Sequence, residues 1–360
     1  MVFLAGPRQS GKTTLALHCA GLASPGSTDR YMNWDATPHR QAVIQERFPE
    51  DPGPLILDEI HKYSRRRQVL KGLCDVRKGE PRILVTGSAR LDHYRRGGDS
   101  LQGRYHFFTL FPFTLEEVGG NPREGLDSLF HLSGFPEPFL SGSETEARRW
   151  GREYRARIVE EDPADLERVL DVALVERPAL RLPELVGAPL SINGLREDLQ
   201  VSHPTVSRWV RLLENVYMIF RVYPFGAQDI RAVKKEAKHY HLDWTRVPDP
   251  AARFENLVAC HLLGWTCFAQ AVNGYDRELK YFRDTDKREV DFIVCEPSRP
   301  LPAVECKLRN RKPAVALRYF KRKFPDVQAV QVVMQFDGDE RTRDGVRVCG
   351  AQRFLRRRIV

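Results

Sequence analysis

The sequence Gly6-Pro7-Arg8-Gln9-Ser10-Gly11-Lys12-Thr13-Thr14 decides the fold of the N-terminal part of the chain. Its form, G-x-x-x-x-G-K-[ST], is that of a phosphate-binding loop, and an apolar run typical of a buried strand precedes it at residues 2–5. The glycines allow a tight turn whose N–H groups point at the phosphates. Lys12 supplies positive charge for the β and γ phosphates, and the hydroxyl of Thr13 binds Mg²⁺. A helical pattern follows, whose N-terminus would face the anion. We expect residues 6–14 to bind ATP, the alternative being a chance match in a glycine-rich turn.

A second apolar run, residues 55–57, ends in the two carboxylates Asp58 and Glu59. ATP hydrolysis needs an acid that holds the metal ion and a group that activates water, and carboxylates perform both tasks. We expect Asp58 to hold Mg²⁺ through water and Glu59 to polarise the attacking water. Paired acids also follow apolar runs by chance, but the phosphate-binding loop upstream favours the functional interpretation.

Two further elements are candidates for the nucleotide site. The apolar run 83–85 is followed by small hydroxyl residues, of which Ser88 or Thr86 is expected to sense the γ-phosphate. Strand ends of a parallel sheet converge on the ligand crevice, while a simple turn at Gly87 is the alternative. Arg104 precedes another apolar strand pattern and is expected to stabilise transition-state charge, in its own site or in that of a neighbouring chain. A neighbour's site would require a homo-oligomer, and a plain surface cation is the alternative.

Together these motifs resemble the AAA-type P-loop ATPases of bacteria and archaea that carry a C-terminal domain of uncharacterised function. Beyond the loop, the resemblance rests on Asp58-Glu59-Ile60-His61-Lys62, Thr86-Gly87-Ser88, Leu101-Gln102-Gly103-Arg104, and Phe111-Pro112-Phe113 with Glu116-Glu117. It covers nearly the whole chain and implies that Arg104 serves the nucleotide site. Members of that family usually have a helical segment before the first strand, whereas this sequence starts inside the strand. Either the start is truncated or the adenine pocket is built differently, so we predict no base-binding residue.

Composition limits the class of protein and its partners. The 360 residues are 42% apolar, enough for two or three domains with ordinary cores. Lys and Arg outnumber Asp and Glu by 57 to 48, for a formal charge of +9, and much of the excess lies near the end of the sequence. Such a surplus favours a polyanionic partner, for which we expect nucleic acid, with DNA favoured over RNA. The alternative is that the same charge belongs to solvated helix faces.

Cysteine spacing and hydropathy indicate the compartment. The seven cysteines form no C-x-x-C pair and no zinc pattern with histidine, which fits a reducing, cytoplasmic environment. The sequence has no apolar run near the ~18 residues that span a bilayer, and its start leads directly into the phosphate-binding loop. We therefore expect no membrane partner.

The middle of the sequence predicts a helical linker and then a winged helix. Residues 134–138 are rich in proline and break the pattern, and residues 150–162 show helical spacing. Two short helices are expected within 190–213, and two strand-like runs follow at 216–224 and 239–243. Winged helices bind DNA in many proteins but also act as rigid spacers or lids, so the partner of this element stays open.

The C-terminal part predicts a helix followed by a hairpin. Asp249 caps a helix that contains Glu255, with proline at its first position. Strand patterns at 289–294 and 303–308 are separated by a short loop. Because strand side chains alternate, Glu305 and Lys307 share a face.

Pairing of the two strands would bring Asp291 beside Glu305 and Lys307. Two carboxylates can hold one or two divalent cations, and the lysine can orient or deprotonate water for attack on a phosphodiester. The arrangement resembles the PD-(D/E)xK nuclease fold, which implies that Asp291, Glu305 and Lys307 are its motif residues and that Glu255 is the acid of its first helix. E-x-K also occurs often on the wet face of ordinary strands.

The sequence therefore predicts an α/β protein in four parts: an AAA-like parallel-sheet ATPase core at 1–120, a helical linker or lid at 121–165, a winged helix at 166–246, and an α/β nuclease-like domain at 247–360. We expect an ATP- and Mg²⁺-dependent ATPase whose cycle drives or gates a nucleic-acid-directed module, itself a metal-dependent nuclease. The alternative is a nucleotide-switched regulator that binds DNA or protein and whose nuclease-like domain is catalytically inactive.

Overall fold

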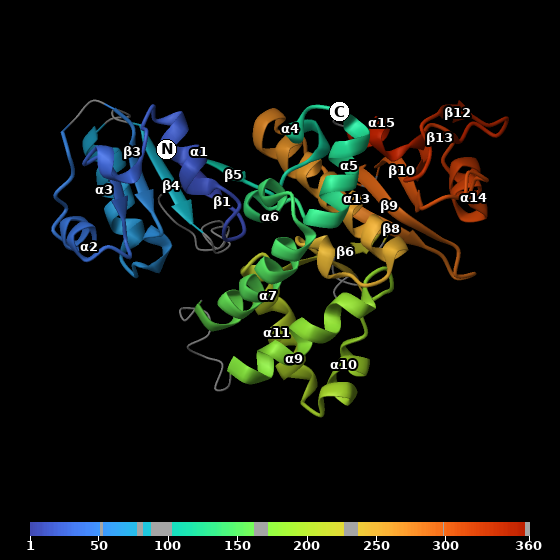
Figure 1. Ribbon diagram of the computed structural model, residues 1–360, viewed down its shortest axis with the longest axis horizontal. Helices are drawn as coiled ribbons and strands as arrows, with labels where there is room; N and C mark the ends of the chain where they lie inside the picture. Colours follow the sequence, from blue (N-terminus) through green and yellow to red (C-terminus); the bar gives the residue numbers. More distant parts are fainter. Residues whose placement is uncertain are drawn as a thin grey trace. The chain divides into compact units, whose positions relative to one another are not determined.

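The computed structural model describes residues 1–50, 53–77, 82–87, 103–161, 172–226, 237–297 and 299–356 (Figure 1). The chain forms two compact units. The N-terminal unit consists of Met1–Phe111 with the short segment Asn215–Tyr217, and the C-terminal unit of Pro112–Glu214 with Met218–Val360. Among the described residues, no helix combines the length and the apolar character needed to cross a membrane.

The N-terminal unit is built on a parallel five-stranded sheet in the order β2-β3-β4-β1-β5. Its strands are β1 (Val2–Ala5), β2 (Tyr31–Asn33), β3 (Leu55–Asp58), β4 (Ile83–Gly87) and β5 (His106–Thr109). Its helices are α1 (Lys12–Cys19), α2 (Thr37–Ile44) and α3 (Arg66–Arg77), with 3₁₀ turns at Pro25–Ser27 and Ile60–Lys62. The strands read as apolar runs because both faces of a parallel sheet are covered.

The order of these strands positions the phosphate-binding loop. Strand β1 lies between β4 and β5, while the next strand in sequence, β2, lies at the far edge beyond β3. Ligands of open α/β sheets bind at the carboxyl ends of strands where the strand order reverses. The loop after β1 and the acids at the end of β3 therefore meet at one edge of the sheet. The parallel sheet predicted from the sequence is confirmed.

The C-terminal unit is built on a mixed eight-stranded sheet in the order β12-β13-β11-β10-β9-β8-β6-β7. The strands are β6 (Ile219–Pro224), β7 (Lys238–His241), β8 (Glu278–Arg283), β9 (Glu289–Glu296), β10 (Arg299–Lys307), β11 (Gln328–Val333), β12 (Asp339–Arg341) and β13 (Arg347–Gly350). The predicted hairpin is confirmed, since β9 and β10 pair in antiparallel register. Helix α14 (Val315–Lys323) packs Leu317 and Phe320 into an apolar cluster with residues of β8 to β11.

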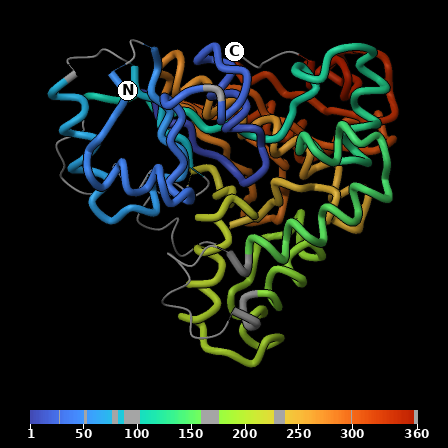
Figure 2. Tube along the Cα trace, turned by 60° about the vertical axis from the view of Figure 1, so that its left-hand side comes forward, coloured from blue at the N-terminus to red at the C-terminus, as the bar shows by residue number. Residues whose placement is uncertain are grey.

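The other helices of this unit are α4 (Leu115–Val118), α5 (Pro122–Leu132), α6 (Pro136–Ser141), α7 (Glu144–Glu161), α9 (Val172–Arg181), α10 (Ile192–Leu199), α11 (His203–Asn215), α13 (Pro250–Phe268) and α15 (Ala351–Leu355). Short turns occur at Leu182–Leu185, Trp244–Arg246 and Ala269–Asn273. In both views α7, α9, α10 and α11 form a bundle that projects from the end of the sheet (Figures 1 and 2).

Two helix predictions for this unit are confirmed, and one predicted connection is partly helical. Asp249 caps α13 as predicted, because its Oδ1 accepts a hydrogen bond from the N–H of Ala252 at 2.8 Å. The helix expected from residue 150 lies within α7. The break expected at residues 134–138 is only partly a connection, because Pro136 begins α6. Proline suits the first helical position, where no N–H is needed.

The winged helix is only partly reproduced. Helices α10 and α11 follow each other as expected, and β6 and β7 pair antiparallel as wing strands do. However, β6 also pairs in parallel with β8, through Tyr223 opposite Lys280 and Pro224 opposite Tyr281. The strands expected to form a separate wing are therefore the edge of the C-terminal sheet.

A buried histidine links α13 to the start of α4. The Nδ1–H of His261 donates to the carbonyl of Leu257 at 2.9 Å, and its Nε2 accepts from the N–H of Leu115 at 3.0 Å. The bond from Leu115 requires the neutral ring, since an imidazolium has no acceptor nitrogen. Burial lowers the pKa of His261 to about 4.

We expect the contribution of His261 to the stability of the C-terminal unit to fall as the pH falls from 6.5 toward 4. In this range the unfolded His261 takes up a proton and the folded one does not, so protons favour the unfolded state; the loss is about 2 kcal/mol at pH 5. Chemical unfolding at pH 7 and pH 5 measures it. His261→Gln should show a shallower pH dependence than the wild type, and the exposed control His203→Gln an unchanged one. Equal slopes in all three proteins would contradict the prediction.

Candidate functional site

The phosphate-binding loop has the backbone geometry that its glycines predict. Gly6 has φ +147°, and a Cβ at this position would lie 2.3 Å from the carbonyl oxygen of Leu110. The N–H of Leu110 in turn donates to the carbonyl of Ala5 at 2.8 Å, so the chain after β5 lies directly against the loop. Gly11 has φ +91° immediately before α1, which begins at Lys12. Only glycine combines these conformations with such a close approach.

The side chains of the loop divide into buried and accessible ones. Lys12 is only 7% exposed, and its ammonium donates to the carbonyl of Pro7 at 2.6 Å, which closes the loop on itself. Ser10 is also buried, and its hydroxyl has no hydrogen-bond partner among the described residues. Thr14 lies in the first turn of α1 with an exposed side chain, and Arg8 and Gln9 are half-buried. Phosphate oxygens would replace the Pro7 carbonyl as acceptors for Lys12.

Asp58 is held at the end of β3 by three hydroxyl groups. Its Oδ2 accepts from Thr13 Oγ1 at 2.9 Å and from the phenol of Tyr31 at 2.6 Å. Its Oδ1 accepts from Thr86 Oγ1 on the neighbouring strand. The carboxylate of Asp58 is thereby fixed beside the hydroxyl of Thr13, as both magnesium predictions require.

The oxygen atoms of Thr13 and Asp58 suit Mg²⁺, which prefers hard oxygen ligands and retains several of its waters. The two side chains lie within hydrogen-bond distance of each other at the carboxyl edge of the sheet. These residues therefore fit the ion that the loop motif implies.

Tyr31 is a site residue that the sequence analysis missed. It lies on the short strand β2, packs with Ala16, Leu17 and Ile56, and directs its hydroxyl at Asp58. Burial, together with the neighbouring Asp58, raises the pKa of Tyr31, so its hydroxyl remains a donor at neutral pH. A strand of three residues with one tyrosine carries too little pattern to indicate this contact.

Glu59 follows Asp58 in a left-handed conformation, with φ +56°. Its N–H donates to the carbonyl of Thr86 at 3.1 Å, so the turn is anchored to β4. Its Oε2 lies 3.6 Å from His61 Nδ1 and 3.7 Å from Lys62 Nζ. Burial and then the adjacent Asp58 raise the pKa of Glu59, as suits a general base.

His61 is neutral at physiological pH. Burial, followed by the charges of Lys62 and Arg66, lowers the pKa of His61 to about 4. Lys62 also forms an ion pair with Asp35 at 2.6 Å. The surroundings of Glu59 therefore include the Lys62 ammonium and the neutral ring of His61, and the charges of Lys12 and Arg8 also act on its carboxylate.

The prediction for Ser88 falls on a residue outside the described ranges. The alternative sensor, Thr86, donates its hydroxyl to Asp58. Arg104 is not brought to the loop. Arg104 precedes β5, its carbonyl accepts from the N-terminal amine of Met1 at 3.3 Å, and its guanidinium pairs with Asp75 on α3. Because β1 and β5 are parallel, Arg104 lies at the amino ends of these strands, whereas the loop follows their carboxyl ends.

In the C-terminal unit the predicted nuclease-like residues gather around β9 and β10. Asp291 Oδ2 accepts from the N–H of Cys306 at 2.8 Å, and Lys307 Nζ donates to Glu305 Oε1 at 2.7 Å. The other oxygen of Glu305, Oε2, is buried without a hydrogen-bond partner among the described residues. Burial is the main cause that raises the pKa of Glu255, Asp291 and Glu305. Cys306, between Glu305 and Lys307 in sequence, is a buried free cysteine.

A lysine that the sequence analysis missed lies at the centre of this cluster. Lys238 on β7 is fully buried, at 0% exposed. Its Nζ lies 2.7 Å from Glu289 Oε1, 3.2 Å from Glu255 Oε1 and 3.9 Å from Asp291 Oδ1. Glu255 also accepts from the hydroxyl of Tyr240 at 2.7 Å. In the part of the chain that the structure describes, no three or more His, Cys, Asp or Glu side chains are arranged to hold a metal ion.

Family comparison assigns the first third of the chain. Residues 1–119 match the family model described as an AAA domain. The match supports an AAA-type ATPase unit, in agreement with the loop and with the geometry of Asp58. Residues 123–245 and 251–354 match two domains of unknown function, DUF8612 and DUF4143. Neither description states an activity.

Uncharacterised bacterial proteins are similar to most of the chain. The chain is 26% identical over 357 residues to an uncharacterised protein of Mycobacterium tuberculosis, and the alignment covers 95% of this chain and 77% of the relative. The values are the same for an uncharacterised protein of Mycobacterium bovis. An uncharacterised protein of Haemophilus influenzae is 23% identical over 330 residues, with 81% of this chain and 78% of the relative covered. The aligned stretches are thus longer than the part of the chain that matches the AAA domain.

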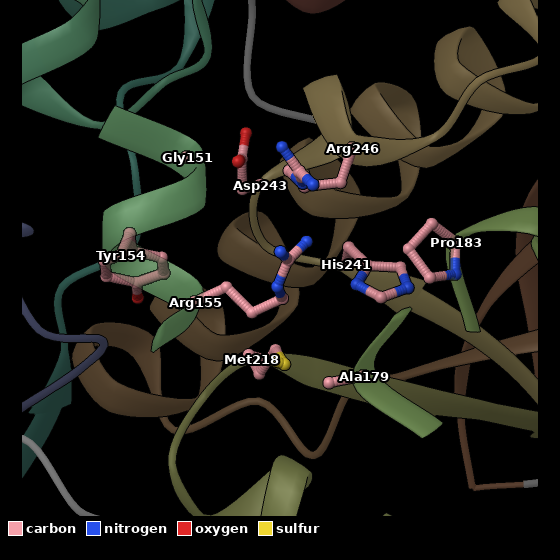
Figure 3. A pocket seen from close by; sticks show the side chains of 9 residues that line it. All are labelled: Gly151, Tyr154, Arg155, Ala179, Pro183, Met218, His241, Asp243 and Arg246. Carbon is pink, nitrogen blue, oxygen red and sulfur yellow. The ribbon is translucent and has the colours of Figure 1, made fainter. Parts of the chain in front are cut away.

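A small polar cavity in the C-terminal unit is not a substrate site. Its volume is about 20 Å³, and Arg155, Arg246, His241 and Asp243 direct their side chains toward it (Figure 3). His241 Nε2 and Asp243 Oδ2 are buried there without hydrogen-bond partners among the described residues. A space of this size accommodates about one water molecule, which these atoms could bind, but no nucleotide or base.

A larger groove of about 480 Å³ in the C-terminal unit is rich in arginine. Its lining residues lie on α5, β12, β13, α15 and the adjoining turns: Asn121, Pro122, Arg123, Asp337, Asp339, Arg347, Gln352, Arg353 and Arg356. Arg347 pairs with Asp339 at 2.6 Å, and Arg123 with Asp337 at 3.2 Å. Arg353 and Arg356 are exposed, so the groove keeps an excess of positive charge.

Proposed function

We propose that this chain binds and hydrolyses ATP in its AAA domain and that the ATPase cycle acts on a nucleic-acid-directed C-terminal module. The observation that carries the proposal is the contact between Thr13 and Asp58, which joins the phosphate-binding loop to the acidic strand. Mg²⁺ held by these two residues would neutralise charge on the β- and γ-phosphates. Lys12 binds the same phosphates, and Glu59 orients and polarises the attacking water.

Lys12→Ala should weaken ATP binding roughly 10- to 100-fold, because a charge-assisted hydrogen bond to phosphate is lost. The residual affinity comes from the backbone N–H groups of the loop. Calorimetry with ATP and Mg²⁺ measures the change, and phosphate release measures hydrolysis in parallel. Lys71→Ala on α3 removes a half-buried lysine of the same unit and should leave both values unchanged. An unchanged affinity in Lys12→Ala would contradict the nucleotide site.

For the C-terminal module, the excess of positive charge at the groove supports a nucleic-acid partner. Arg353 and Arg356 would contact phosphates, since phosphate contacts dominate binding that is independent of sequence. The AAA domain would then change the affinity of this module between its nucleotide states.

We expect binding of double-stranded DNA to weaken steeply with added salt, and Arg353→Ala and Arg356→Ala each to reduce the salt slope by about 1. Fluorescence anisotropy at several salt concentrations measures both effects. Arg148→Ala, which removes an exposed arginine paired with Glu144 on α7, is the matched control. An affinity that does not respond to salt would contradict the proposal.

Two forms of this module remain, a nuclease and a regulator that binds without cutting. Lys238 favours the second form, because an ammonium stands among the carboxylates that a nuclease would use for metal ions. Incubation with single- and double-stranded DNA and RNA, ATP, and Mg²⁺ or Mn²⁺ tests this. We expect binding without cleavage. Cleavage that Asp291→Ala and Lys307→Ala both abolish would support the nuclease.

A further inference from the structure

The C-terminal unit contains a cluster of carboxylates whose negative charge is partly balanced by two lysine side chains. Four carboxylates, from Glu255, Glu289, Asp291 and Glu305, come from α13, β9 and β10. Two lysines balance part of this charge: Lys307 binds Glu305 at 2.7 Å, and Lys238 lies among the other three acids. Buried carboxylates are very costly when unpaired, so the cluster needs a positive charge at its centre.

Lys238 is fixed in this position by the sheet. On β7 its Cα pairs with that of Val222 on β6, and an isolated bridge joins it to Pro189 on its other side. Its side chain passes along Tyr281, with Nζ 5.6 Å from the ring centroid. No part of it is exposed to solvent. The ammonium therefore cannot leave the cluster while the edge of the sheet stays paired and Lys238 stays covered.

Beside Lys238, one oxygen each of Glu255 and Asp291 already accepts hydrogen bonds, whereas Glu305 Oε2 is buried without a partner among the described residues. Glu255 Oε1 accepts from both Lys238 and Tyr240, and Asp291 Oδ2 accepts from the N–H of Cys306. A divalent ion needs several oxygens at about 2.0–2.6 Å and would stand beside a fixed positive charge. The space between Glu255 and Asp291 thus does not fit the metal ion that the nuclease-like motif implies.

We infer that Lys238 is the resident cation of this cluster and that its ammonium takes the position between Glu255 and Asp291 that a divalent ion would otherwise occupy. The cluster holds α13, β7 and β9 together without Mg²⁺ or Mn²⁺. The inference concerns the C-terminal unit alone, and it stands whether or not the AAA domain hydrolyses ATP.

The test is Mn²⁺ binding by the nucleotide-free full-length protein, measured by calorimetry. We expect the wild type and Asp291→Asn to bind the same number of Mn²⁺ ions, because the cluster of the wild type holds none. Lys238→Met keeps the length of the side chain and removes its charge, and it should create a Mn²⁺ site that binds at least roughly tenfold tighter than any wild-type site. Asp291→Asn added to Lys238→Met should abolish that site. Mn²⁺ should also raise the thermal unfolding temperature of Lys238→Met and not that of the wild type.

Lys280→Met is the matched control, because Lys280 on β8, which β6 separates from β7, pairs with the exposed Glu278 at 2.7 Å. It should gain no Mn²⁺ site. If the single variant Lys238→Met does not fold, the double variant Lys238→Met with Glu255→Gln should fold. The double variant removes one positive and one negative charge, so the net charge of the cluster is unchanged. If this double variant also does not fold, Lys238 acts through packing and not through its charge, and the inference is overturned. A wild-type Mn²⁺ site that Asp291→Asn removes, or no gain in folded Lys238→Met, would also overturn it.

Discussion

Glu59→Gln should bind ATP as tightly as the wild type and hydrolyse it about 10²- to 10⁴-fold more slowly, the usual contribution of a positioned general base. The substitution keeps the shape of the side chain and removes its negative charge. The affinity is retained because the loop residues, Lys12 above all, make the phosphate contacts. Calorimetry with ATP and single-turnover phosphate release separate the two effects.

The conformation and the burial of Glu59 both support its role as the general base. The left-handed turn at φ +56° directs the side chain away from the line of β3, and the bond from its N–H to Thr86 holds the turn. Burial raises the pKa of Glu59, so its carboxylate is a better proton acceptor than an exposed one.

Glu46→Gln is the matched control for this experiment. Glu46 lies in the same unit, is exposed, and also has a positive φ of 54°. The change from glutamate to glutamine in a left-handed conformation is therefore tested away from the loop. We expect wild-type turnover in Glu46→Gln. Normal turnover in Glu59→Gln would remove Glu59 as the base.

The nucleotide site could be predicted where its residues are contiguous in sequence. Gly6, Gly11, Lys12 and Thr13 form one motif whose backbone requirements are local, so the sequence specifies them completely. Asp58 could be predicted because a buried strand that ends in acids, downstream of a phosphate-binding loop, is typical of a metal-binding strand. Tyr31 could not, because its role depends on β2 lying beside β3, a pairing that no local pattern expresses.

In the C-terminal unit, too, local patterns could be predicted from the sequence, whereas pairings between distant strands could not. The hairpin of β9 and β10, with Glu305 and Lys307 on one face, follows from strand alternation and was predicted correctly. The place of β6 was not, because an apolar strand after two helices fits a wing as well as a sheet edge. Only the parallel pairing of β6 with β8, more than 50 residues later, distinguishes them.

Lys238 was missed for a related reason. A lysine at the start of a short strand usually has an exposed ammonium, and nothing in the sequence near it indicates burial. Its three acidic neighbours come from α13 and β9, which lie 17 to 53 residues further along the chain. The position becomes visible only when β7 joins the edge of the C-terminal sheet.

Arg104→Ala should lower the turnover number by about 10³-fold and leave ATP affinity unchanged, as expected for an arginine finger that acts from a neighbouring chain. The four-residue strand β5 places Arg104 at least about 13 Å from the edge where the loop lies, counted at about 3.3 Å per residue. Arg104 thus does not reach the nucleotide site of its own chain. Its side chain is partly exposed even while it pairs with Asp75, so a neighbouring chain can contact it. Action in trans requires assembly, so specific activity should rise with protein concentration.

A mixing experiment tests this arrangement directly. Arg104→Ala and Glu59→Gln should each be nearly inactive, while an equimolar mixture should recover activity, because some mixed sites combine an intact Glu59 with an intact Arg104 from the neighbour. Asp75→Ala is the control, since it breaks the ion pair but keeps the arginine. If Asp75→Ala loses as much activity as Arg104→Ala, the pair is structural. If the mixture stays inactive and the rate per chain does not depend on concentration, Arg104 has no role in a neighbouring site.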